Sequence, residues 1–510
     1  MKQTLLRDLS KQTKLLIVIT VMLVTIIEIL DMTIVNVALP PMMGELGANS
    51  DQITWVLTSY IVSSAIIMPL TGFLVTRIGR KKLLLINIGG FLTASMLCGL
   101  ATTLPFLVLM RIFQGIFGAT LVPMSQYILR DTFQQKDQGT AMAIWGLGVM
   151  VAPVIGPTLG GYITQTLSWH WVFYINIPVC LAAFLLTLAV IPDTPTKKEK
   201  IDITGLVLMV IGIIALQMFL DRGNSAGWYS SKSIQVLTAT AIFFIATFIV
   251  RGLLIKDNIV NLRLFGNRNF LLGTLMFTLF SIGIIGIISV QPLMLEHLMN
   301  YTAENAGLVM APRGIAAGIS MFVAGMLVNR IDTRWLILAG IIIADIGTYE
   351  MSVVNLQASF SVIAWQGAIQ GFGMGLFFVP IAMIALSTLK DKHIAEASGL
   401  FGFGRNLGVS IGISIISTII TQETQINWNR LGGHLKQTSY QLQRWLQMQH
   451  ITLDNPIAHQ KLAIQLAQQA SLTAFVDAYW VISISFLVMI PLVFLLKKAD
   501  LAGGAHTGVH

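Results

Sequence analysis

Fourteen long apolar segments constrain the fold of this chain more than any other feature of its sequence. Each approaches or exceeds the roughly 20 residues that an α-helix needs to cross the hydrocarbon core of a bilayer. Hydropathy therefore predicts an all-α polytopic membrane protein with fourteen transmembrane helices. We place them at residues 15–38, 54–74, 83–103, 106–129, 139–163, 171–191, 203–220, 234–253, 270–291, 305–328, 335–354, 360–388, 395–420 and 476–496.

Composition agrees with a membrane protein and argues against several other classes. Hydrophobic residues make up 55% of the 510 residues and charged residues only 11%, about half the usual share in globular proteins. The first segment is too long for a cleaved signal peptide. Cys98 and Cys180 both lie in apolar segments, so we expect no disulfide framework, and no His or Cys spacing predicts a metal site.

The positions of the basic residues predict the orientation of the chain. Loops 39–53, 164–170, 292–304 and 355–359 contain no Lys or Arg. Basic residues gather instead in the N-terminal tail and in the alternate loops, at 77–82, 197–200 and 251–268. By the positive-inside rule both termini are cytoplasmic. The net charge of +9 is then a topology signal, and we expect no nucleic-acid partner.

An internal repeat predicts two related halves. GFLVTRIGRKK (72–82) matches GMLVNRIDTRW (325–335) at an offset of 253, and the Gln-Gly pair at 114–115 matches that at 370–371 at an offset of 256. Parallel repeats of six helices are one way in which secondary transporters are built. The predicted division is a tail at 1–14, a six-helix bundle at 15–191, two inserted helices at 203–253, a second bundle at 270–496 with an outside loop at 421–475, and a tail at 497–510.

Two acidic residues interrupt the first apolar segment. A carboxylate such as Glu28 or Asp31 in mid-membrane costs roughly 3 kcal/mol on insertion scales. Because the two are three residues apart, they share one helix face at about 5–6 Å. Burial favours the protonated form of a carboxyl, and a second carboxyl nearby strengthens that preference. The pair is therefore a candidate for proton exchange. The alternative is that Asp31 only bonds a neighbouring helix.

Several motifs resemble one known family. They are LDMTIVNVALP (30–40), GFLVTRIGRKK (72–82), RIFQG (111–115), GVMVAPVIGPTLGG (148–161) and WHWVFYINIP (169–178). Together they are similar to the major facilitator superfamily, and in particular to the EmrB-type multidrug exporters among its fourteen-helix drug:proton antiporters. The similarity covers nearly the whole chain. In one departure, Thr76 stands where the family usually has Asp.

The resemblance implies the major facilitator fold, two six-helix bundles plus two extra helices, and a set of residues that serve conformational change. These are Gly72, Arg77, Gly79, Arg80 and Lys81 in the loop after the second helix, and Gly148, Gly156, Pro157, Gly160 and Gly161 in the fifth. Small residues let helices approach closely, and a proline bends a helix.

The resemblance also implies proton-driven multidrug efflux by alternating access, with Asp31 coupling the proton. Glu28 lies outside the family motif, and we assign it to proton coupling from its spacing alone. Arg111 is the expected counter-charge. No enzyme activity and no cofactor other than the proton gradient are expected. The implied substrates are lipophilic drugs, and the implied location is a bacterial inner membrane. A periplasmic adaptor and an outer-membrane channel are the implied partners, with loop 421–475 as a docking surface. The alternative is a same-fold exporter of one dedicated substrate, such as a siderophore, lipid or metabolite.

Other polar and aromatic residues in the spans are weaker candidates. Gln114, Trp145 and Arg405 are expected at the substrate cavity. The pairing of Arg111 with Asp31 could also be purely structural. We expect Arg313 to lie near the end of its span, from which a long side chain can reach the interface.

Overall fold

The computed structural model describes residues 9–197, 201–255, 258–328, 330–435, 439–448 and 456–498. Within these ranges the chain is helical and contains no strand, which confirms the all-α prediction. Most of the tails predicted at 1–14 and 497–510 lies outside the described residues.

The first half of the chain forms one group of packed helices. Its elements are α1 (Lys11–Glu45), α2 (Ser50–Ile53), α3 (Trp55–Ile67), η2 (Met68–Leu70), α4 (Thr71–Ile78), α5 (Arg80–Gly99), α6 (Leu104–Gly118), α7 (Leu121–Thr132), α8 (Gln135–Thr166), α9 (Trp171–Tyr174) and α10 (Asn176–Val190). Within this half α1 packs on α8 and α10, and α6 packs on α3 and α5.

An inserted pair of helices follows, and then a second group. The insert comprises α11 (Ile203–Arg222), η3 (Trp228–Ser230), α12 (Lys232–Leu254) and η4 (Leu262–Gly266). The second group comprises α13 (Arg268–Leu293), η5 (Met294–Leu298), α14 (Ala303–Leu327), α15 (Thr333–Met351), α16 (Phe360–Ser387), η6 (Asp391–His393), α17 (Ile394–Gly433), α18 (Tyr440–Met448) and α19 (Pro456–Leu495). Here α16 packs against α14 and α15, and α17 against α13 and α19.

The helices are long and apolar enough for a multi-pass membrane protein. Twelve candidate spans occur among the described residues, and α8 makes thirteen if its two bent parts are one span. The bend in α8 is 44°, between Asp137–Pro153 and Thr158–Thr166. The remaining predicted span, 335–354, corresponds to α15. This helix carries three charged residues, Arg334, Asp345 and Glu350, and is therefore less apolar than the other spans.

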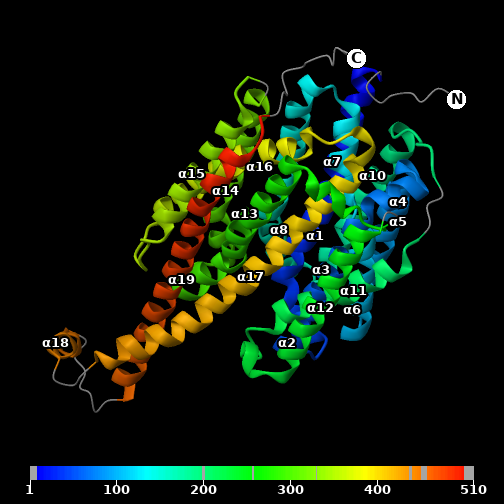
Figure 1. The fold of residues 1–510 in the computed structure, drawn as a ribbon. Helices are drawn as coiled ribbons and strands as arrows, with labels where there is room; N and C mark the ends of the chain where they lie inside the picture. The colour runs from blue at the N-terminus through cyan, green and yellow to red at the C-terminus, as the bar shows by residue number, and fades with distance from the viewer. Residues whose placement is uncertain are drawn as a thin grey trace.

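The two groups meet along α8 and α14 and at one end of α17 (Figure 1). The start of α17 packs against α4, α7 and η2 of the first group. We call the end of the molecule where α1 begins and α19 finishes the terminal end (Figure 1). A Cβ on Gly399 of α17 would lie 2.7 Å from the carbonyl oxygen of Met68. The two groups are therefore in direct contact near the terminal end.

The described part of residues 421–475, which we predict as an outside loop, is largely helical. α17 continues to Gly433, and α19 already begins at Pro456. Only α18 is a separate helix, and it packs through Leu442 and Leu446 against Ala458. We call residues 423–433, 440–448 and 456–470 the stalk, which Figure 1 shows projecting from the end opposite the terminal end. Both long helices extend because no Gly or Pro breaks them there.

The inserted helix α11 touches both groups at its stalk-facing end. The hydroxyl of Thr58 on α3 donates to Asp221 at 2.9 Å, and the hydroxyl of Ser414 on α17 donates to the Leu220 carbonyl at 2.8 Å. Just after α11, the amide of Asn224 donates to Thr421 at 3.1 Å. The insert therefore links the two groups.

Candidate functional site

Asp31 lies at the centre of a buried polar network within the first group. Its Oδ2 accepts a bond from Arg111 Nη1 at 2.5 Å, and its Oδ1 accepts bonds from Gln114 Nε2 at 2.8 Å and Asn176 Nδ2 at 2.9 Å. The same two amides also donate to the Ser95 hydroxyl, at 2.7 Å and 3.2 Å. The Asp31 carboxyl therefore has three N–H donors, one of them from a charged guanidinium, and charge-assisted hydrogen bonds are the strong ones.

Arg111 is held by more than its carboxylate partner. Its Nε donates to the Val56 carbonyl at 3.0 Å, and its Nη1 also donates to Gln114 Oε1 at 2.8 Å. The guanidinium lies 4.4 Å from the centre of the Tyr60 ring, within the range of a cation–π interaction. The pairing of Arg111 with Asp31, expected from the family resemblance, is therefore present and fully buried.

Glu28 lies one turn before Asp31 on the same helix but has no such partners. Its side chain is completely buried, and neither carboxyl oxygen has a hydrogen-bond partner among the described residues. It is close enough to interact electrostatically with Asp31 and with Arg405 of α17. Glu28 therefore faces a charge on the other half of the molecule, whereas Asp31 is bound within its own half.

The residues expected at the substrate cavity occupy three different places. Gln114 belongs to the Asp31 network. Arg405 is 9% exposed and forms a long 3.5 Å bond to its neighbour Asn406. Trp145 is fully buried, and its indole N–H donates to Thr25 of α1 at 2.7 Å.

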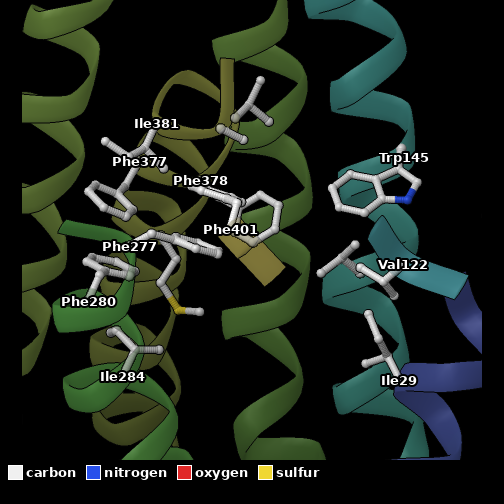
Figure 2. Close-up of a cluster of buried hydrophobic side chains, with 14 of the residues drawn as sticks. Ile29, Val122, Trp145, Phe277, Phe280, Ile284, Phe377, Phe378, Ile381 and Phe401 are labelled. Atoms are coloured by element: carbon white, nitrogen blue, oxygen red, sulfur yellow. The ribbon is translucent and has the colours of Figure 1, made fainter. Parts of the chain in front are cut away.

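An aromatic cluster separates the two groups beside Trp145. Figure 2 shows Trp145, Ile29 and Val122 on one side, with phenylalanines of α13, α16 and α17 on the other. The rings of Trp145 and Phe378 have centroids 5.9 Å apart, and those of Phe277 and Phe401 are stacked at 4.6 Å. Trp145, Phe378 and Phe401 are all buried, so the two groups meet here through packed aromatic side chains.

The glycines predicted in the fifth span face α1. A Cβ on Gly160 would lie 2.9 Å from Ile34 Cγ1, and one on Gly148 would lie 3.2 Å from Ile26 Cγ1. Gly156 would meet the hydroxyl of Thr33, whereas Gly161 has only an ordinary contact. The helix that carries Glu28 and Asp31 thus packs on a glycine surface. Pro157 falls in the stretch 154–157, where α8 bends.

The predicted loop motif lies at the contact between the two groups. Gly72 allows the start of α17 to approach, because a Cβ there would lie 2.7 Å from the Glu396 nitrogen. Gly79 forms the turn between α4 and α5 with a φ of +91°, which glycine adopts without strain. The side chain of Arg80 pairs with Asp131 at 2.6 Å. Lys81 donates to the Leu188 carbonyl at 2.8 Å, and Arg77 lies 5.9 Å from the Phe73 ring.

Thr76 takes no part in an ion pair, as its chemistry requires. Its hydroxyl donates to the Gly72 carbonyl one turn earlier, at 2.9 Å. Glu396 of α17, which lies against Gly72, accepts a bond from Asn261 at 3.0 Å and lies 3.1 Å from the His393 ring.

The sequence did not point to every residue of the network. Asn176 lies within the motif 169–178, but neither it nor Ser95 was singled out, because one amide or hydroxyl in an apolar span is common. The prediction for Arg313 was wrong. It lies in the middle of α14 and is 4% exposed, so it does not reach the interface. Among the described residues no group of three His, Cys, Asp or Glu side chains is arranged to hold a metal.

Comparison with known proteins agrees with this architecture. A model of the Major Facilitator Superfamily matches residues 21–413. Among solved structures, the human organic anion transporter MFSD10 superposes with a TM-score of 0.62 at 13% identity, covering 94% of this chain and 99% of that one. Two helical groups in contact, with a buried ion pair in the first, therefore define a multi-pass membrane protein of the major facilitator fold.

Relatives at higher identity narrow the family. The chain is 36% identical over 496 residues to the multidrug export protein EmrB of Escherichia coli, covering 96% of this chain and 97% of that protein. It is also 36% identical over 487 residues to the fatty acid resistance protein FarB of Neisseria gonorrhoeae, covering 94% and 96%. The chain belongs to the Major Facilitator Superfamily and is a homologue of its EmrB-type members.

Proposed function

We propose that this chain is a proton-driven multidrug exporter that moves lipophilic molecules across a bacterial inner membrane by alternating access. Similarity to EmrB over nearly the whole chain supports export of drugs. The observation that carries the proton-coupling part is a contrast between two acids: Asp31 accepts bonds from three donors, whereas Glu28 has no hydrogen-bond donor within the described parts of the chain.

In this proposal Glu28 carries the exchangeable proton. An ionised carboxylate with no donor in a buried site costs several kcal/mol, so Glu28 is neutral when the surroundings are as described here. Separation of the two groups would admit water to α1, and hydration of the carboxylate would then favour loss of the proton. Asp31 has a structural role in this proposal, because Arg111 and two amides bind it within its own group.

The coupling follows from competition between proton and drug. A proton taken up from the outside returns Glu28 to its neutral form and lets the apolar surfaces of the two groups close again. Release of that proton toward the cytoplasm then completes the cycle. A ligand shifts such an equilibrium only by its differential affinity for the two states. The aromatic cluster of Trp145, Phe378 and Phe401 is the surface on which we propose that lipophilic substrates lie.

Transport of dyes by the purified protein in proteoliposomes tests the proposal. Uptake of several unrelated lipophilic dyes should be accelerated by a pH gradient and should be lost when an ionophore collapses that gradient. Each dye should also compete with the others. Uptake that ignores the gradient would contradict proton coupling, and uptake of one dye alone would contradict multidrug export.

A second candidate is a proton-coupled exporter of one dedicated substrate, such as a siderophore, lipid or metabolite. The similarity to a protein named for fatty acid resistance favours a lipid among these. The same dye panel separates the two candidates if a medium-chain fatty acid is included. Inhibition by the fatty acid, with no transport of unrelated dyes, would favour the dedicated exporter.

We also propose that the stalk binds a periplasmic adaptor protein, which connects the exporter to an outer-membrane channel. α17 has 40 residues. At roughly 1.5 Å per residue, its length exceeds the roughly 30 Å thickness of a hydrocarbon core. The stalk exposes Ile426, Tyr440 and Ile464, and exposed apolar side chains of this kind anchor protein interfaces. A chain whose stalk is replaced by a short linker should still transport dye in proteoliposomes but should confer no drug resistance on cells.

A further inference from the structure

The second half of the molecule repeats the polar pair that supports Asp31 in the first half. There Gln114 Nε2 donates to the Ser95 hydroxyl at 2.7 Å. In the second half Gln370, which matches Gln114 at the repeat offset of 256, donates through Nε2 to the Thr348 hydroxyl at 2.8 Å. Gln114 of α6 and Gln370 of α16, which occupy matching positions of the repeat, therefore make the same kind of hydrogen bond.

Arg313 occupies the place that Tyr60 holds in the first half. In each half, the glycine that follows the glutamine packs on the backbone of a neighbouring helix, which is α3 in the first half and α14 in the second. A Cβ on Gly115 would lie 3.1 Å from the Cα of Tyr60, and one on Gly371 would lie 2.9 Å from the Cα of Arg313. The arginine near the glutamine thus belongs to α14 in the second half, whereas in the first half it belongs to α6.

The position that matches Arg111 in the second half is Gly367, which lies beside Arg313. Three residues before Gln114 stands Arg111, but three residues before Gln370 stands Gly367. A Cβ on Gly367 would lie 3.7 Å from Arg313 Cβ and 3.8 Å from its Nε. Each half therefore has a buried arginine near its glutamine. Arg111 lies on the same helix as Gln114, whereas Arg313 lies on a helix that neighbours that of Gln370.

The negative charge has no counterpart in the second half. The helix equivalent to α1 is α13, and Arg268–Leu293 contains no Asp or Glu. Among the described residues no carboxylate lies within 4.0 Å of Arg313, and its Nε and Nη1 have no hydrogen-bond partner. Its Nη2 lies 3.8 Å from the sulfur of Met351. Asp345, an acid of α15, accepts a bond from Ser483 instead.

Two further polar atoms of this region have no hydrogen-bond partner in the part of the chain that the structure describes. They are the hydroxyl of Tyr479, which interacts electrostatically with the guanidinium, and Oε1 of Gln370. A guanidinium stays charged in proteins, and an unpaired buried charge costs several kcal/mol. The hydroxyl of Tyr479 can donate a second hydrogen bond to whatever compensates the charge.

We infer that Arg313 and Tyr479 form a binding site for a monovalent anion inside the second helical group. The chemistry fits a halide ion from solution or the carboxylate of a bound lipophilic molecule, since both accept bonds from N–H and O–H donors. The halide version goes beyond the proposed export function, whereas the carboxylate version rests on it.

Anion-dependent stability of the purified full-length protein tests this inference without measuring transport. Thermal unfolding in a nonionic detergent is followed at constant ionic strength while sodium sulfate is replaced by sodium chloride or by sodium hexanoate. Saturable binding to the folded state should raise the midpoint by about 2–4 °C for the wild-type chain. A rise with chloride alone identifies a halide, and a rise with hexanoate alone identifies a carboxylate.

Two variants and a control make the result specific. Arg313→Gln should lose the anion response, whereas Arg334→Gln, whose arginine already pairs with Asp332 at 2.8 Å, should keep it. Gly367→Asp places a carboxylate beside Arg313 and should abolish the response while raising the midpoint in sulfate. If Arg313→Gln does not fold, Gly367→Asp decides. A wild-type midpoint that ignores both anions, or a response that either site variant retains, would overturn the inference.

Discussion

Glu28 and Asp31 lie one helical turn apart on α1 in opposite surroundings. Asp31 accepts bonds from one guanidinium and two amides, whereas no donor in the described ranges reaches Glu28. Two adjacent carboxyls with different environments are suited to different roles, one as a fixed charge and one as a proton carrier. The contrast also explains why both acids are tolerated in one apolar segment, because one is paired and the other can be neutral.

The network predicts that lysine cannot replace Arg111. Three acceptors bind this guanidinium, namely Asp31, Gln114 and the Val56 carbonyl, and a lysine ammonium has a different geometry. Arg111→Lys should lower the free energy of unfolding by about 1–3 kcal/mol and should abolish dye transport. Thermal unfolding and proteoliposome uptake measure both effects.

A matched control for this change is Arg334→Lys, which alters an arginine paired with Asp332 by a partly exposed ion pair. It should change stability by less than about 1 kcal/mol. Equal effects of the two lysine variants would argue against a special role of the Arg111 geometry.

The glycine surface of α8 predicts opposite results for two neighbouring positions. Gly160→Ala places a methyl group 2.9 Å from Ile34 Cγ1 and 3.0 Å from the Ile34 carbonyl oxygen, and overpacking of this kind costs about 1–3 kcal/mol. Gly161→Ala has only a 3.9 Å contact with Val37, so it should be neutral or stabilising. Unfolding midpoints of the two variants measured side by side would reveal the difference, and equal midpoints would show that α8 does not pack on α1 in this way.

A pH-dependent contribution to stability is expected at the start of the inserted pair. Burial alone would raise the pKa of Asp202, but the hydrogen bond from Arg251 at 2.5 Å and that from the Gly205 N–H at 3.0 Å outweigh it and lower this pKa below its usual value. A lowered pKa means that the carboxylate stabilises the folded state above the pKa it has when unfolded, about 3.9. That contribution is lost as pH falls through the folded pKa.

The variant Asp202→Asn tests this contribution. It should unfold at a lower temperature than the wild-type chain at pH 7, and the difference should shrink as the pH is lowered below about 4. A difference that stays constant or grows on acidification would contradict the assigned charge pairing.

Much of the fold could be predicted from the sequence because the bilayer imposes a length on each span. The inserted helix predicted at 203–220 is Ile203–Arg222. In the second group, the helix predicted at 360–388 is Phe360–Ser387. The continuation of α17 and α19 into the stalk could not be predicted, because hydropathy reports where a helix enters water and not where it ends. α17 and α19 continue past that boundary in a polar sequence that has no helix-breaking residue.

The site was predictable where a charge was out of place. Glu28, Asp31 and Arg111 are costly in an apolar segment, so the sequence itself indicates them. The roles of Ser95 and Asn176 depend on which helices meet, and that information is not local. Gln114 was expected at a cavity, but its neighbours place it in the Asp31 network. The repeat identified Gln370 as its equivalent, yet only the contacts of Gly371 and Gly115 relate Arg313 to Tyr60.

Proton-driven transport by Glu28→Gln tests the central claim most directly. Glutamine has the shape of a neutral glutamic acid, so the variant should fold with an unchanged unfolding midpoint and should still move dye down its concentration gradient. In proteoliposomes with an imposed pH gradient, the account predicts that this variant gains no acceleration over its rate without the gradient, and that dye addition releases no proton flux. Normal uphill dye transport driven by the pH gradient in Glu28→Gln would contradict the account.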